Sequence, residues 1–166
     1  MVESQPTVVV ITTGGTIASR LDPSTGGVVP AVSGEDLVRA VPGLSDVARI
    51  EVRPFGNVLG PALTPEDLFA ISSQTNEALG RSDVSGVVIT AGTGIIEEGS
   101  YLCELLNPTS KPIVWTGAQF SADYGISGGF VEDHAPQGRA LLCTQPPCGQ
   151  HARESDAYEV ALKIRV

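Results

Sequence analysis

Three short apolar runs, each ending in a glycine-containing turn, constrain the fold of this 166-residue chain most strongly. They span residues 7–12, 84–90 and 112–116, and none alternates apolar with polar residues as a half-exposed strand does. Continuous apolar runs of this length are typical of strands that are covered on both faces, as in a parallel sheet. Segments with helical spacing separate the runs. The order strand, loop, helix therefore predicts a three-layer α/β fold, a parallel sheet with helices on both faces.

Apolar residues at helical spacing indicate three helices. These are expected over residues 34–41, 65–79 and 95–106. Ser33 and Thr64 precede the first two segments and are predicted N-caps, because their hydroxyls can accept hydrogen bonds from the first free backbone amides.

The remaining segments carry weaker signals. Residues 49–55 are expected to form another strand, and residues 20–33, rich in Gly, Pro, Ser and Asp, are expected to form a flexible loop. In the less regular C-terminal part, residues 139–144 and 158–166 are candidate strands.

The composition disfavours several classes of function. The chain has 10 Lys and Arg residues and 19 Asp and Glu residues, which gives a net charge of -9. Because an acidic chain repels phosphate groups, binding to nucleic acid or to a membrane surface is not expected. No apolar run is long enough to span a bilayer, and residues 1–6 lack the features of a signal peptide, so a cytoplasmic protein is expected. The three cysteines and two histidines lack the spacing of a metal site, and neither a metal nor a cofactor is expected.

Small polar residues follow three of the expected strands, at residues 13–16, 90–93 and 116–119. The carboxyl ends of parallel strands meet at one edge of a sheet, where α/β proteins bind their ligands. We therefore expect these three turns to lie together and to form the functional site.

Thr16, in the first of these turns, is the main candidate for chemistry. Its hydroxyl can serve as a nucleophile while backbone amides of the turn stabilise an oxyanion. The alternative is a hydroxyl that only caps an ordinary strand-to-helix loop. Phosphate binding is less well supported, because Gly14 and Gly15 have neither the GxGxxG spacing nor the GK[ST] ending.

The same turns carry a resemblance to the bacterial L-asparaginase family. Residues 8–18, VVVITTGGTIA, resemble the first signature of the family with its TGGTIA core. Residues 86–98 resemble the second signature, HGTDT followed by an aliphatic residue and EE, and residues 111–119 resemble the KPVV-TGAM segment. Order and spacing agree over residues 7–129.

The resemblance implies the N-terminal α/β domain of a two-domain enzyme that hydrolyses L-asparagine to L-aspartate and ammonia. It implies that Thr16 forms the acyl-enzyme and that Thr93 acts with a neighbouring Asp and a later Lys to activate a nucleophile. It also implies a homo-oligomer, since the family assembles its sites between subunits. The substrate-binding positions expected on this basis are Gly15, Gly60, Pro61, Gly92 and Gly94.

Several positions depart from the family pattern. Ala91 stands in place of the signature histidine, Gly94 in place of the aspartate and Ile95 in place of the second threonine. Because position 94 is glycine, the chain lacks the aspartate that in the family is both a triad member and the carboxylate that anchors the α-amino group of the substrate. The triad lysine would correspond to Ala157.

The expected organisation is an asparaginase-like α/β domain over residues 1–129 and an irregular extension of it over residues 130–166, without the smaller C-terminal domain of the family. Two functional hypotheses follow. One is an active amidohydrolase. The other is an impaired or inactive domain that keeps the fold and weak ligand binding, because a threonine hydroxyl needs an activating partner and triad members act together. A nucleotide-binding module is a third hypothesis, resting only on the glycine turns.

Overall fold

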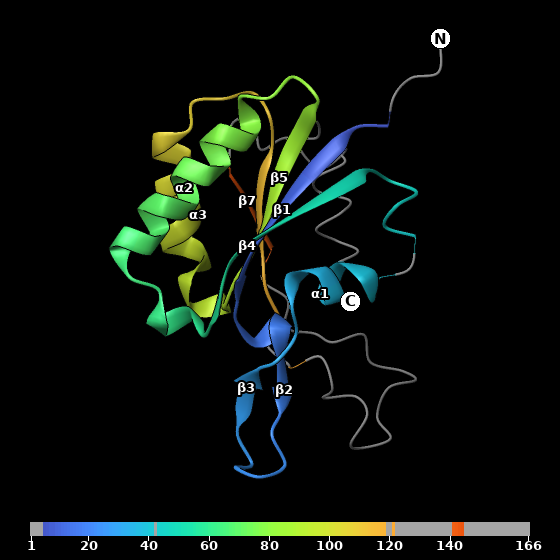
Figure 1. The fold of residues 1–166 in the computed structure, drawn as a ribbon. Coiled ribbons are helices and arrows are strands. Elements are labelled where there is room, and N and C mark those ends of the chain that lie inside the picture. The colour runs from blue at the N-terminus through green and yellow to red at the C-terminus, as the bar shows by residue number, and fades with distance from the viewer. Residues whose placement is uncertain (1–4, 42, 119–120, 122–140, 145–166) are drawn as a thin grey trace.

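A five-stranded sheet forms the centre of the molecule (Figure 1). The computed structural model describes residues 5–41, 43–118, 121 and 141–144. The sheet has the strand order β4-β1-β5-β6-β7. Its strands are β1 (Thr7–Gly14), β4 (Arg49–Val58), β5 (Val84–Thr90), β6 (Ile113–Thr116) and β7 (Leu141–Thr144).

Four of these strands are parallel, which confirms the expected sheet type. β1 pairs in parallel with both β4 and β5, and β5 pairs in parallel with β6. The edge strand β7 runs antiparallel to β6, an orientation that the sequence patterns do not predict.

Helices cover both faces of the sheet, as the three-layer prediction requires (Figure 1). The helices α2 (Pro65–Leu79) and α3 (Ile96–Leu106) lie on one face, and the short helix α1 (Gly34–Arg39) lies on the other. The two faces bury separate apolar clusters because successive side chains of a strand point to opposite sides. In β1, Val9 and Ile11 belong to the cluster beneath α2 and α3, while Val8 and Val10 belong to the cluster beneath α1.

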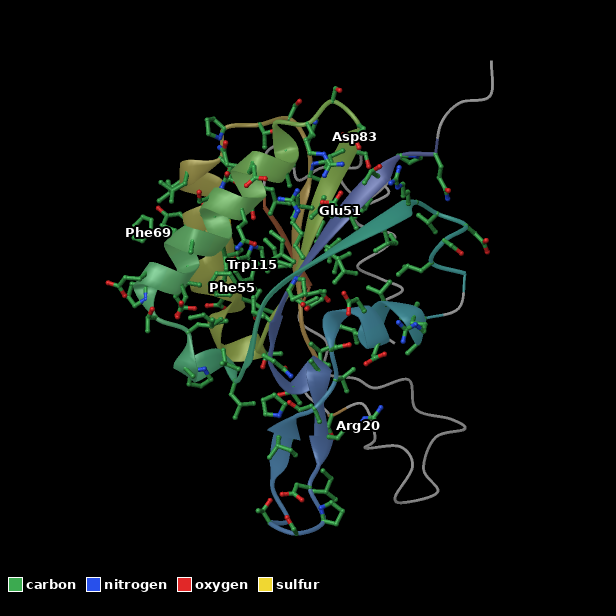
Figure 2. All side chains as sticks on the ribbon, viewed as in Figure 1. Arg20, Glu51, Phe55, Phe69, Asp83 and Trp115 are labelled. Carbon is green, nitrogen blue, oxygen red and sulfur yellow. The ribbon has the colours of Figure 1, made fainter. Side chains whose placement is uncertain are left out.

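Trp115 is the largest buried side chain of the α2 and α3 face. It points from β6 toward the helices, whereas Phe69 of α2 points away from the sheet (Figure 2). A Cβ atom added to Gly99 of α3 would lie 2.6 Å from the Cζ3 atom of the Trp115 ring. The absence of a side chain at position 99 therefore lets the indole fit beneath α3.

The helix starts agree with the predicted caps. Ser33 accepts a hydrogen bond from the backbone amide of Asp36, and Thr64 forms a reciprocal capping box with Asp67. The hydrogen bonds from Thr64 lower the pKa of Asp67. α3 starts slightly later than expected, because a 3₁₀ turn, η3 (Thr93–Ile95), precedes it.

The expectation of a flexible loop over residues 20–33 is wrong. The segment forms an antiparallel hairpin of β2 (Ser19–Leu21) and β3 (Val28–Pro30). Asp22 organises its turn: the Asp22 amide donates to the carbonyl of Gly27, and the Asp22 carboxylate accepts hydrogen bonds from Ser24 and Thr25. Turn-forming residues thus produce an ordered reversal instead of a loop.

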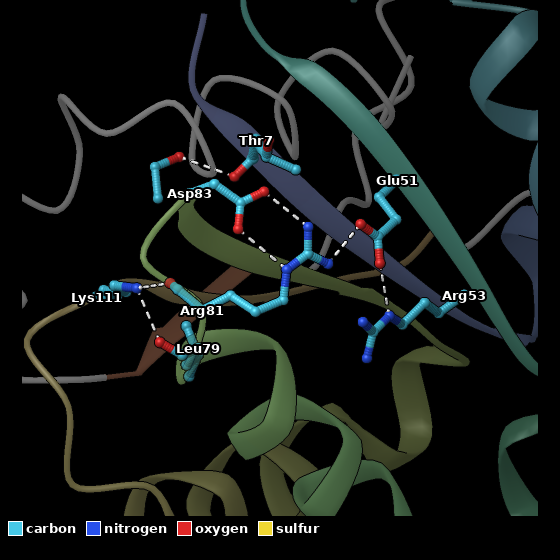
Figure 3. Close-up of polar contacts among 8 residues, drawn as sticks. Thr7, Glu51, Arg53, Leu79, Arg81, Asp83 and Lys111 are labelled. Carbon is cyan, nitrogen blue, oxygen red and sulfur yellow. Dashed lines mark hydrogen bonds and ion pairs between the residues drawn. The ribbon is translucent and has the colours of Figure 1, made fainter. Parts of the chain in front are cut away.

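An ion-pair network lies at the end of the sheet where the parallel strands begin (Figure 3). Arg81 bridges Glu51 of β4 and Asp83, and Arg53 also contacts Glu51. The hydrogen bond from Arg81 is the main reason why the pKa of Glu51 lies below its usual value. Lys111 donates to the backbone carbonyl of Leu79 at 2.8 Å and thereby holds the C-terminal end of α2.

The strand predicted over residues 49–55 is too short, since β4 continues to Val58. The candidate strand at residues 139–144 is confirmed over Leu141–Thr144 as β7, and residues 139–140 lie outside the described residues. The candidate strand at residues 158–166 lies outside the described residues.

Candidate functional site

Three glycines bring separate loops into direct contact at the carboxyl ends of the parallel strands. A Cβ atom added to Gly15, after β1, would lie 2.7 Å from the Cα atom of Gly92, after β5. A Cβ atom added to Gly92 would lie 2.8 Å from the Cα atom of Gly60, which begins the 3₁₀ turn η2 (Gly60–Ala62). Backbone meets backbone at both points, so no larger residue fits without displacing a loop.

The turn after β6 reaches the same place. A Cβ atom on Gly117 would lie 2.5 Å from the carbonyl oxygen of Ala91 and 3.4 Å from the Cγ2 atom of Thr93. The amide of Ala91 also donates to the carbonyl of Thr116 at 2.9 Å. The prediction that the three glycine-containing turns share one edge of the sheet is therefore confirmed.

The strand register explains this convergence. Thr12 of β1 pairs with Thr90 of β5, and Thr90 pairs with Thr116 of β6. The three strands consequently end at the same level, and the residues that follow them are neighbours.

Thr16 and Thr93 occupy equivalent places in two of these turns. Each directly follows a glycine of the Gly15–Gly92 contact, and each begins a short 3₁₀ turn; the first of these is η1 (Thr16–Ala18). Both residues are partly buried. The structure thus brings the two predicted threonines to the same edge of the sheet.

Hydrogen bonds fix the first turn. The amide of Gly15 donates to the carbonyl of Val58 at 2.8 Å, and the Ser19 hydroxyl donates to the carbonyl of Gly15 at 2.8 Å. The Thr13 hydroxyl donates to the carbonyl of Thr90 at 3.0 Å. Gly15 has a φ of 78°, which favours glycine.

The other predicted substrate positions differ in their surroundings. Gly60 is buried in the contact with Gly92, while Pro61 beside it is exposed. Gly94 is exposed, and a Cβ atom there would have no atom within 4 Å. Its φ is not positive, so the backbone at position 94 can accept a side chain.

Charge is scarce in these turns. Residues 13–18, 57–63 and 91–96 contain no Asp, Glu, Lys, Arg or His. The nearest acids along the chain are Glu97 and Glu98, both exposed in the first turn of α3, where acids stabilise a helix.

Three positions further along the chain lie outside the described residues: the two histidines, His134 and His151, and Ala157, which stands at the expected lysine position. Within the described residues, no group of His, Cys, Asp and Glu side chains is arranged to hold a metal ion. No helix of the described part is long and apolar enough to cross a membrane.

Chemically, the edge offers two threonine hydroxyls and backbone amides in glycine turns. Hydroxyls and amides can donate hydrogen bonds to a carbonyl oxygen, and a hydroxyl can attack a carbonyl carbon if a base accepts its proton. Sequence reasoning missed Thr13 and Ser19, which hold the first turn. Their only signal was a run of small hydroxyl residues around the Gly-Gly pair.

Residues 7–130 match the family model described as asparaginase, N-terminal. A glutamyl-tRNA(Gln) amidotransferase subunit of Pyrococcus furiosus is 39% identical over 119 residues, which cover 71% of this chain and 27% of that protein. The corresponding amidotransferase subunit of Methanopyrus kandleri is 40% identical over 120 residues, covering 71% and 26%. The chain thus spans about a quarter of the length of these curated relatives.

A similar solved structure is that of a probable cytoplasmic L-asparaginase from Campylobacter jejuni. It superposes with a TM-score of 0.62 and 27% sequence identity, over 70% of this chain and 34% of that chain. The strand order and the glycine turns of the structure are consistent with the match to the family model. The chain therefore belongs to the asparaginase family, through the part that matches the N-terminal domain of that family.

Proposed function

We propose that the chain is an amidohydrolase of the L-asparaginase type, which converts L-asparagine and water to L-aspartate and ammonia. Thr16 is the proposed nucleophile. Its Oγ1 atom bonds to the carbon of the side-chain amide, the C–N bond breaks, and ammonia leaves after taking up a proton. Water then cleaves the resulting ester, releasing aspartate and restoring the Thr16 hydroxyl.

One observation carries this proposal: the contact between Gly15 and Gly92, which holds the Thr16 and Thr93 turns together at the ligand-binding edge of the sheet. Backbone amides of these turns are suited to stabilise the oxyanion that forms when the hydroxyl attacks. In this proposal Thr93 supports the second step, and the substrate contacts are Gly15, Gly60, Pro61, Gly92 and Gly94.

The names of the relatives support a reaction on an amide group in general more strongly than they support L-asparagine as the particular substrate. One is named a probable L-asparaginase and others are named glutamyl-tRNA(Gln) amidotransferase subunits. We therefore propose L-asparagine as the first substrate to test and L-glutamine as the comparison. A cytoplasmic location and assembly with further subunits, above all with other copies of this chain, belong to the same proposal.

The alternative is an impaired or inactive domain that retains the fold and weak ligand binding. It is favoured by the lack of ionisable side chains in the turns at residues 13–18, 57–63 and 91–96. The exposed Gly94 in particular supplies no carboxylate to pair with an α-ammonium group.

Ammonia release by the purified 166-residue chain distinguishes the two possibilities. The wild-type chain, Thr16→Ala and Gly94→Asp should be compared with L-asparagine and with L-glutamine. The amidohydrolase proposal predicts turnover by wild type that is lost in Thr16→Ala. No turnover by wild type, together with turnover by Gly94→Asp, supports the impaired domain. Turnover that persists in Thr16→Ala would exclude Thr16 as the nucleophile.

A further inference from the structure

We propose that Thr13 is a positioning residue that fixes the Thr93 turn relative to the Thr16 turn. Its effect on catalysis rests on the proposed function, whereas its effect on the geometry of the turns does not. Thr13 is fully buried, and its hydroxyl donates to the backbone carbonyl of Thr90 at 3.0 Å. The bond joins residues that are 77 positions apart in the chain.

The hydrogen bond from Thr13 is important because it lies just beyond the last backbone pair of β1 and β5. The backbone pairing of β1 with β5 ends at Thr12 and Thr90. On its other side, β1 shifts register against β4, so that Gly14 pairs with Val58. β4 therefore carries two extra residues relative to β1 at this point. On the β5 side, the Thr13 side chain extends the link between β1 and β5 by one residue.

The first turn is consequently held from both neighbouring strands. On the β4 side the amide of Gly15 donates to Val58, and on the β5 side the hydroxyl of Thr13 donates to Thr90. The Thr90 carbonyl lies two residues before Gly92, which touches Gly15. The hydrogen bond from Thr13 to Thr90 and the close contact of Gly15 with Gly92 thus jointly set the distance between the Thr16 turn and the Thr93 turn.

The presence of a threonine at position 13 supports a specific role for its hydroxyl group. Position 13 lies on the same face of β1 as Val9 and Ile11, and that face is part of the apolar core beneath α2 and α3. Valine has nearly the same shape as threonine and would bury no polar atom. A hydroxyl at this buried position is favourable because it is bonded to Thr90.

Thr13→Val removes the hydroxyl and keeps the shape, whereas Thr13→Ser keeps the hydroxyl. The matched control is Thr75→Val. Thr75 is also fully buried, and its hydroxyl also donates to a backbone carbonyl, that of Ile71 at 2.9 Å, but it lies within α2. Both valine variants lose a buried hydrogen bond to a backbone carbonyl, and only the bond from Thr13 joins the strands that carry the turns.

For a nucleophile that must meet its substrate in a fixed geometry, a displacement of about 1 Å lowers the rate on the order of 100-fold. We expect Thr13→Val to lower kcat for ammonia release about ten- to a hundredfold, with KM changed less than about threefold. Thr13→Ser should restore most of kcat, and Thr75→Val should leave it unchanged.

An amide NMR spectrum of the full chain tests the geometry without any need for activity. We expect the Gly92 and Thr93 amide resonances to shift in Thr13→Val but not in Thr13→Ser or Thr75→Val. Equal shifts in Thr13→Val and Thr75→Val would overturn the proposal. Shifted resonances with an unchanged kcat would overturn the catalytic part of it. Wild-type protein without turnover would refute the proposed function, while the NMR comparison would still decide whether Thr13 positions the turns.

Discussion

Gly92→Ala tests the packing that brings the site together. The added Cβ would lie 2.8 Å from both the Cα and the N atom of Gly60. Carbon atoms in good contact are about 3.5–4.0 Å apart, so the two loops would have to separate by about 1 Å. Gly92 has a φ of -66° and a ψ of 140°, which suit any residue, so the cost comes from the contact and not from backbone strain.

Overpacking of this kind costs about 1–3 kcal/mol. A loss of about 2 kcal/mol would lower Tm by about 4–8 °C for a chain of this size. The same displacement should lower amidase turnover on the order of 100-fold, since it separates the turns that carry Thr16 and Thr93.

Gly94→Ala is the matched control in the same turn. Position 94 is exposed and its added Cβ would meet no atom within 4 Å, so the free energy of unfolding should change by less than about 0.5 kcal/mol. Thermal unfolding of the two variants and of wild type makes the comparison. Equal Tm values for Gly92→Ala and Gly94→Ala would refute the proposed contact of the three glycines.

Three further predictions concern the core and the ion pairs. Gly99→Ala should lower Tm and change the emission of Trp115, the only tryptophan, because the new Cβ would lie 2.6 Å from the Cζ3 atom of its ring. Glu51→Gln should be less stable than wild type above about pH 4.5, the usual pKa of the group. Arg81 lowers that pKa in the folded state, so the difference in the free energy of unfolding between Glu51→Gln and wild type should vanish as the pH falls through the lowered value. Denaturation measured at a series of acidic pH values tests this, and a difference that does not depend on pH would contradict it. Burial raises the pKa of Cys103 to about 11, so mass spectrometry should find its thiol unalkylated in folded protein at pH 8 and alkylated after unfolding.

Sequence reasoning was most successful where a local pattern determines the structure. The mainly apolar segment at residues 84–90 predicted the bounds of β5, and the hydroxyl residues Ser33 and Thr64 predicted two helix starts. The convergence of the three turns followed from the parallel strand order, because strand ends of a parallel sheet share an edge.

It was least successful where residues that are distant in the chain determine the structure. The hairpin of β2 and β3 was missed, because its turn residues resemble those of a loop until the cross-strand pairing is known. The contact of Gly60 with Gly92 and the hydrogen bond from Thr13 to Thr90 depend on how separate loops pack. No local pattern reports such contacts.

Whether Thr16 is the nucleophile of an amidohydrolase can be read from the mass of the Thr16 peptide during turnover. The full chain should be mixed with L-asparagine, quenched in acid and digested before mass spectrometry. One aspartyl group is expected on the peptide that contains Thr16, and none on the same peptide of Thr16→Ala. Ammonia release by wild type without an aspartyl ester on that peptide, or with the same ester in Thr16→Ala, would contradict it.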